Sequence, residues 1–152
     1  MSAAIPQPRA AIGAPHYAGF WVRVLAFFID ALALGVIASA VTLGQAGVVI
    51  WDHWLELVAW RNFLETALSF LYFTIFWSTI GGGQTLGMRL LGLRVVGANG
   101  SPIDYAAAVI RWIGIVISAA VVLLGLIWVA FDARKQGWHD KMASTFVVHL
   151  DR

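Results

Sequence analysis

The chain has 152 residues and a formal net charge of +2, with 61% hydrophobic and only 12% charged residues. A soluble domain carries about 25% charged residues, so this composition excludes an ordinary water-facing surface and indicates an integral membrane protein of one domain. The chain contains no cysteine, which excludes disulfides, thiolate nucleophiles, iron–sulfur ligation and cysteine zinc sites. Its eight tryptophans fit a membrane protein, because Trp concentrates where lipid headgroups meet water.

The N-terminal part divides into a tail and a first apolar run. Residues 1–17 hold three of the four prolines, which predicts a flexible tail ahead of a single membrane domain over residues 18–150. The run 24–44 is broken only by Asp30, and at about 1.5 Å per residue it covers the roughly 30 Å hydrocarbon core as a transmembrane helix. A secretory signal peptide cleaved near residues 38–40 is the alternative, and the acid inside its apolar core argues against it.

The middle of the chain is first mixed and then apolar. In residues 45–61, Trp51, Trp54 and Val58 share one helix face, which predicts either a short helix at the membrane surface or a polar loop with aromatic anchors. The apolar run 63–80 predicts a second transmembrane helix, with Glu65 near its end in the headgroup region.

The C-terminal half contains two strand-like runs and a third apolar segment. Gly81, Gly82 and Gly83 end the second helix. Residues 93–96 and 145–149 are rich in β-branched residues, so they could pair as a small sheet at the cytoplasmic surface. The segment 113–131 is long enough for one crossing, and it could equally be a broken, re-entrant segment. The expected fold class is therefore an all-α membrane protein with a possible β pairing.

The basic residues orient the chain, since Lys and Arg prefer the cytoplasmic side. They place the N-terminus and the loop 81–111 in the cytoplasm of a multi-pass protein of the cell membrane. If residues 113–131 cross fully, the basic residues divide five and five between the two sides. If the segment enters and returns, every basic residue except Arg61 is cytoplasmic. Both topologies stay open at this point.

Asp30 is the first candidate for chemistry, because an acid at the centre of a membrane helix costs about 2.5–3.5 kcal/mol on insertion scales. Arg23 precedes it by seven residues, so both side chains share a helix face. Asp30 is either an ion or proton site or a structural polar contact. The candidate polar cluster comprises Arg23, Asp30, Arg111, Asp132 and Asp140. The cytoplasmic basic residues that could face lipid are Arg89, Arg94, Arg134 and Lys135.

Enzyme chemistry has no support in the motifs. The chain lacks G-x-S-x-G, a P-loop and H-E-x-x-H, so we predict no catalytic residues and no cofactor. The adjacent His139 and Asp140 are too few for a metal site. Nucleic-acid binding is not expected either, because membrane orientation already explains the basic residues. The expected partners are the lipid bilayer and either further copies of the chain or other membrane proteins.

Three blocks of the sequence resemble the RDD family of prokaryotic membrane proteins, named for one Arg and two Asp. They are residues 18–30 (AGFWVRVLAFFID), 84–96 (QTLGMRLLGLRVV) and 131–145 (FDARKQGWHDKMAST). Together they span nearly the whole chain. The resemblance assigns the family's Arg to Arg23, its first Asp to Asp30, and its second Asp to Asp140 or Asp132, of which Asp140 is preferred.

The chain departs from the family pattern at Met88, where Lys is frequent, and at Ser144, where Gly is usual. For some members of the family, cation/proton exchange has been proposed. The resemblance therefore implies the architecture more than the activity. Two hypotheses follow: a small oligomeric transporter that uses Asp30, or a non-catalytic scaffold that binds other membrane proteins or anionic lipid.

Overall fold

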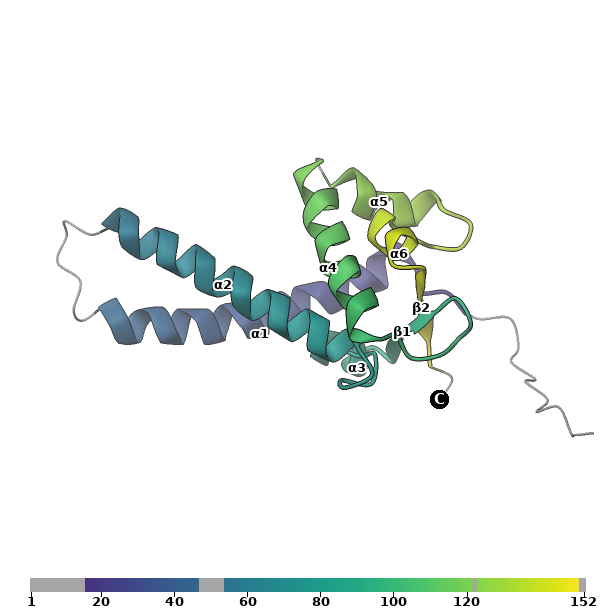
Figure 1. Cartoon of the computed structure of the whole chain (residues 1–152), viewed down its shortest axis with the longest axis horizontal. Coiled ribbons are helices and arrows are strands. Elements are labelled where there is room, and N and C mark those ends of the chain that lie inside the picture. The colour runs from purple at the N-terminus through teal and green to yellow at the C-terminus, as the bar shows by residue number, and fades with distance from the viewer. Residues whose placement is uncertain (1–15, 47–53, 122, 151–152) are drawn as a thin grey trace, which may run out of the picture.

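The computed structural model describes residues 16–46, 54–121 and 123–150. In them, α1 and α2 form a long hairpin, and the other elements gather around one end of it (Figure 1). The elements in chain order are α1 (Phe20–Ala46), α2 (Trp54–Trp77), α3 (Leu86–Leu90), β1 (Leu93–Gly97), α4 (Tyr105–Ala120), α5 (Leu124–Phe131), α6 (Trp138–Met142) and β2 (Thr145–His149). Most of the predicted N-terminal tail, residues 1–15, lies outside the described residues.

Helix α1 contains the predicted first apolar run. Its stretch Phe20–Val41 has a mean hydropathy of 2.4 and is long enough to cross a membrane. Large apolar side chains along it, such as Phe28 and Val36, are exposed on its outer face. Among the described residues, α1 is the only unbroken helix that is both long enough and apolar enough to cross a membrane.

Helix α2 is longer and more polar than the predicted second span. It begins at Trp54, so residues 54–61 are its first turns rather than a separate surface helix, while residues 47–53 lie outside the described part of the chain. Its first half carries an exposed ion pair between Arg61 and Glu65 at 2.8 Å, which lowers its hydropathy. It ends at Trp77 rather than at residue 80, because Ser78 and the glycines that follow form a turn.

The third apolar segment is broken. Helices α4 and α5 are together long and apolar enough for a span, but they are bent by 101° at a break that includes residue 122, which is outside the described residues. Leu123 has a left-handed backbone with φ of 61°, and Gly125 lies against Ser118 with no room for a Cβ atom. Helix α5 therefore folds back onto α4.

The predicted strand pairing is confirmed. Strands β1 and β2 are antiparallel, with Leu93 opposite His149 and Val95 opposite Val147. Both partners of the second pair are fully buried, in a core that also contains Phe73 and Trp77 of α2. We call α3, β1, β2, α6 and residues 132–137 the cap. The cap covers the end of the hairpin at which α1 begins (Figure 1).

A buried Arg–Asp cluster and a second buried acid

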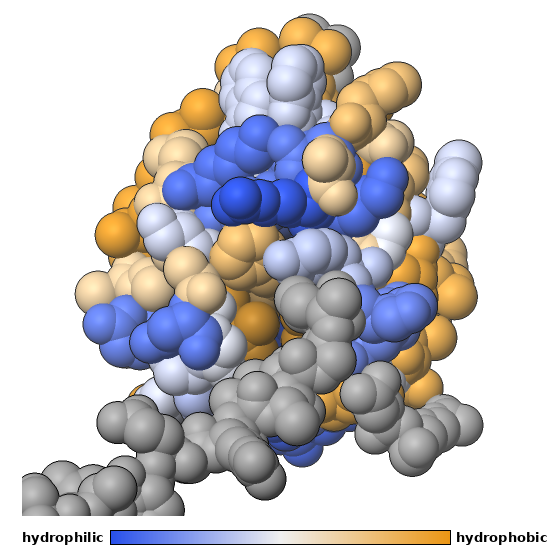
Figure 2. Space-filling model, turned by 90° about the vertical axis from the view of Figure 1, so that its right-hand side faces the viewer, coloured by the Kyte–Doolittle hydropathy of each residue, from blue (hydrophilic) through white to orange (hydrophobic). Residues whose placement is uncertain are grey.

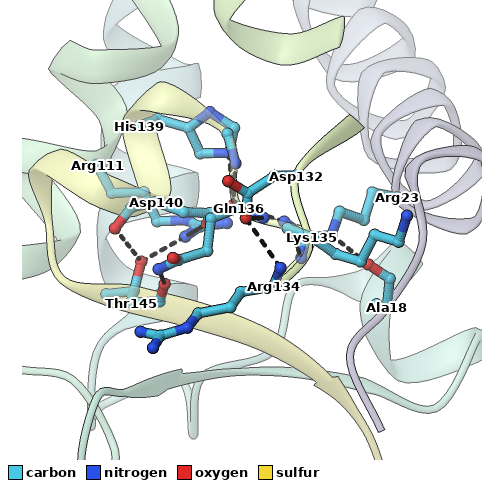
Figure 3. A network of polar contacts seen from close by, with 11 residues as sticks. Ala18, Arg23, Arg111, Asp132, Arg134, Lys135, Gln136, His139, Asp140 and Thr145 are labelled. Carbon is cyan, nitrogen blue, oxygen red and sulfur yellow. Dashed lines mark hydrogen bonds and ion pairs between the residues drawn. The ribbon is translucent and has the colours of Figure 1, made fainter. Parts of the chain in front are cut away.

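The carboxylate of Asp140 is the centre of the first polar site (Figure 3). It is fully buried, and its Oδ2 accepts hydrogen bonds from Arg23 Nη1 at 2.6 Å and from Gly137 N at 2.9 Å. Its Oδ1 accepts one from Arg111 Nη1. Gly137 precedes α6, so the acid caps its own helix while it pairs with two arginines from α1 and α4.

Each arginine makes further bonds that tie the cap to the helices. Arg23 donates to Ala18 O at 3.0 Å and to Lys135 O at 2.5 Å. Arg111 donates to Thr145 Oγ1 at 2.7 Å, and its guanidinium carbon lies 5.0 Å from the centre of the Trp77 ring. The cluster thus joins α1, α2, α4, α6 and the start of β2 at one point.

The electrostatics of the cluster fix its charge state. Burial by itself raises the pKa of Asp140, but the positive charges of Arg111 and Arg23 outweigh this effect and hold the pKa well below its usual value. His139 is also buried, and its pKa falls to about 4, chiefly because burial disfavours the charged imidazole. The nearby Asp140 carboxylate opposes this fall, and the charges of Arg111 and Arg23 add to it. At neutral pH the cluster therefore contains two cations, one anion and a neutral histidine.

Asp30 forms a separate site on α1. It is 2% exposed, and it accepts hydrogen bonds from Tyr72 Oη at 2.7 Å, Thr85 Oγ1 at 2.6 Å and Gly87 N at 2.7 Å. Tyr72 Oη in turn accepts from Leu86 N at 2.9 Å. The acid therefore holds the beginning of α3 against α1 and α2, and its recorded partners are neutral groups rather than Arg23.

Tyr72 and Thr85 were missed by sequence reasoning. Tyr72 is one aromatic residue among many in an apolar run, so nothing local marks its hydroxyl. Thr85 offered a weak signal, because it stands directly before a short helix, and it caps that helix by accepting from Met88 N at 3.3 Å.

Asp132 lies apart from both buried sites. Its Oδ1 accepts from Lys141 Nζ at 2.6 Å, and its Oδ2 accepts from the backbone N–H groups of Arg134 and Gln136 at 3.0 and 3.1 Å. The hydrogen bond from Lys141 is the main reason that the pKa of Asp132 is lowered. The structure thus brings Arg23, Arg111 and Asp140 together, and it places Asp132 in a loop near the surface.

The predicted basic residues lie in or next to the cap. Arg134 and Arg89 are exposed, while Arg94 and Lys135 are half-buried. Arg89 donates to Gly81 O at 3.0 Å and stacks over Phe76, and Lys135 Nζ donates to Ala130 O at 3.1 Å. Figure 2 shows hydrophilic side chains in a band across this end of the molecule, with hydrophobic ones at its edges.

A cavity of about 150 Å³ lies between the two polar sites. Arg23, Asp30, Trp77, Arg111 and His139 are among its lining residues. In the described part of the chain, three buried nitrogens of these residues have no hydrogen-bond partner: Trp77 Nε1, Arg111 Nε and His139 Nδ1. The described residues contain no group of three side chains that could hold a metal ion.

This arrangement defines a class: a mainly helical protein in which an apolar spanning helix is tied to a polar cap by buried Arg–Asp contacts. The RDD family model matches residues 17–144, which include Arg23, Asp30, Asp132 and Asp140. The chain belongs to the RDD family.

Two similar proteins come from Bacillus subtilis (strain 168). "Uncharacterized protein YxaI" is 31% identical over 148 residues, covering 87% of this chain and 97% of YxaI. "Uncharacterized membrane protein YteJ" is 32% identical over 137 residues, covering 88% of this chain and 81% of YteJ. No solved structure matches the chain.

Proposed function

We propose that this protein is a non-catalytic, multi-pass protein of the cell membrane that acts by binding other membrane components through its cap. The observation that carries the proposal is that both buried acids already make intramolecular hydrogen bonds with both of their oxygens. Asp30 has three donors around it, and Asp140 has two arginines and a backbone N–H. Acids engaged in this way support a structural role rather than a turnover role.

The proposed topology follows from the same packing. Helix α1 crosses the membrane and α2 returns, because Tyr72 Oη in the last part of α2 accepts a hydrogen bond of 2.9 Å from Leu86 N of α3, which belongs to the cap. The bent α4–α5 pair enters and leaves on the side of the cap. All lysines and arginines except Arg61 then lie on the cytoplasmic side, as the positive-inside rule requires. The name of YteJ, a membrane protein, supports a location in a membrane.

The exposed positively charged side chains of the cap favour a partner of negative charge. Arg134 and Lys141 are exposed, and they stand beside a face that the proposed topology puts at the cytoplasmic leaflet. Each basic residue near such a surface contributes about 1 kcal/mol of attraction to anionic lipid. An acidic segment of another membrane protein offers the same charge, so the partner is an anionic membrane component.

Chemical cross-linking in native membranes, followed by purification in mild detergent, tests the proposal. The native protein should carry specific companions, and Arg134→Glu should lose them while the protein stays folded and abundant. Arg61→Glu, the same charge reversal far from the cap, is the matched control and should keep them. A solitary native protein, or companions that survive Arg134→Glu, would overturn the proposed binding surface.

Transport is the second candidate, because the cavity borders Asp30. In this version several copies would enclose a path and Asp30 would bind a cation or a proton. Cation/proton exchange is measured in proteoliposomes with the native protein and with Asp30→Asn. Exchange that depends on Asp30 supports transport, whereas equal exchange by both proteins, or none by the native protein, rules it out.

A further inference from the structure

The cavity between the helices has the size and walls of a small-molecule site. Its volume is about 150 Å³, and apolar side chains such as Phe73, Ile115, Leu126 and Val129 form most of its lining. An engineered apolar cavity of about 150 Å³ admits benzene. The space therefore suits a molecule of roughly that size.

Two buried N–H groups of residues that line this cavity have no hydrogen-bond acceptor among the described residues. Within the described residues, Trp77 Nε1 and Arg111 Nε have no hydrogen-bond partner, although the two residues are 3% and 2% exposed. The guanidinium carbon and the indole ring are 5.0 Å apart, so both donors belong to one corner of the cavity. Leaving a buried donor unpaired costs about 1–3 kcal/mol, and an acceptor oxygen in the cavity would remove that cost.

The charges around the cavity favour a neutral ligand. Arg23 and Arg111 are already paired with Asp140, and His139 adds no charge at neutral pH because its pKa is about 4. An anion would bring a further charge into a mostly apolar space, which is unfavourable. A neutral acceptor would accept hydrogen bonds from the two donors without adding a charge.

We propose that the cavity binds a small, neutral, mostly apolar molecule whose carbonyl oxygen accepts hydrogen bonds from Trp77 Nε1–H and Arg111 Nε–H. Such a molecule reaches the cavity from the lipid phase. Val24 and Phe27 of α1 line the cavity and are also 41% and 50% exposed on the outer surface, so the wall is continuous with the lipid-facing side of α1.

Fluorine NMR of the full chain in nanodiscs tests this site with three probes of one shape. The ketone para-fluoroacetophenone should give a saturable bound signal. The hydrocarbon para-fluoroethylbenzene should bind about tenfold more weakly, which corresponds to about 1.4 kcal/mol, and para-fluorobenzoate should not bind. Empty nanodiscs give the background from lipid.

Two pairs of measurements separate the site from misfolding. Trp77→Phe keeps an aromatic side chain and removes the donor, so it should weaken binding of the ketone more than binding of the hydrocarbon. Val129→Phe fills the cavity and should abolish ketone binding, whereas Ile127→Phe, at a position of α5 that is 40% exposed, should preserve it. Equal affinity for ketone and hydrocarbon, preference for benzoate, or binding unaffected by Val129→Phe would overturn the proposal.

Discussion

The backbone N–H of Gly87 donates a 2.7 Å hydrogen bond to Asp30 Oδ1, so the start of α3 is fixed directly against α1. The approach is so close that a Cβ atom at residue 87 would overlap the carbonyl group of Ala26. The contact therefore depends on glycine for space rather than for backbone freedom.

Gly87→Ala should push α3 away from α1 and lengthen the hydrogen bond to Asp30. We expect a loss of about 1–3 kcal/mol, the usual cost of forcing extra atoms into a packed site, measured as a lower midpoint of thermal unfolding in detergent. Gly19→Ala is the control, because a Cβ there would meet no atom within 4 Å. Equal midpoints for the two variants would contradict the close contact.

Asp140→Asn should be the most damaging single-atom change in the cap. It leaves Arg23 and Arg111 buried without their counter-charge, and breaking a buried pair in this way costs about 3–5 kcal/mol. Asp132→Asn is the matched change at an exposed pair, since the Lys141 side chain is 46% exposed, and it should cost less than about 1 kcal/mol. Thermal unfolding of both variants in the same detergent measures the difference. Similar losses would mean that burial of the Asp140 pair does not govern stability.

The loss of folding stability as the pH falls below neutrality should depend on His139. Its pKa is about 4 in the folded protein and about 6.5 when unfolded, so the unfolded chain binds the proton more readily. Stability is therefore complete above pH 6.5 and falls as the pH drops toward 4, by about 3 kcal/mol over this window. Asp140, whose pKa is also lowered from its ordinary value of 3.8, loses its own contribution to stability only as the pH falls below that value.

Unfolding midpoints between pH 4.5 and 7.5 measure this dependence. His139→Gln keeps a polar group of similar reach and removes the titration, so its profile should be much flatter over the same window. A native profile that is flat between pH 6.5 and 4.5 would show that the imidazole does not stay neutral. A variant profile as steep as the native one would show that another group causes the pH dependence.

The elements that local pattern controls were predictable from the sequence. A run of apolar residues predicted α1, and β-branched runs predicted β1 and β2 and made their pairing possible. The length of α2 was not predictable, because the charged Arg61 and Glu65 weaken the apolar signal of its first half. The bend after Ala120 was open, since Gly125 permits a fold-back without requiring it.

The partners of the buried polar residues were also not predictable from the sequence. The seven-residue spacing put Arg23 and Asp30 on one face of α1, but it could not say that they serve different partners. Arg23 meets Asp140 across 117 positions, and Asp30 meets Gly87 across 57. Only the tertiary fold, which brings Met88 of α3 and His139 of α6 to the same cavity, decides which acid binds which donor.

The pairing of β1 with β2 makes a sharp prediction about topology. Residues 93–97 and 145–149 are hydrogen-bonded neighbours, so the loop after β1 and the loop before α6 must lie on one side of the membrane.

The chain has no cysteine, so single-cysteine variants can be labelled without background. Ala98→Cys and Ala133→Cys, both at exposed positions, should react with a membrane-impermeant maleimide in inverted vesicles and not in intact cells. Ala59→Cys, at an exposed position near the start of α2, should react in intact cells, because the length of α1 separates the start of α2 from the cap. Labelling of Ala133→Cys on the opposite side from Ala98→Cys would mean that α4 and α5 cross the membrane fully, and it would exclude the re-entrant topology.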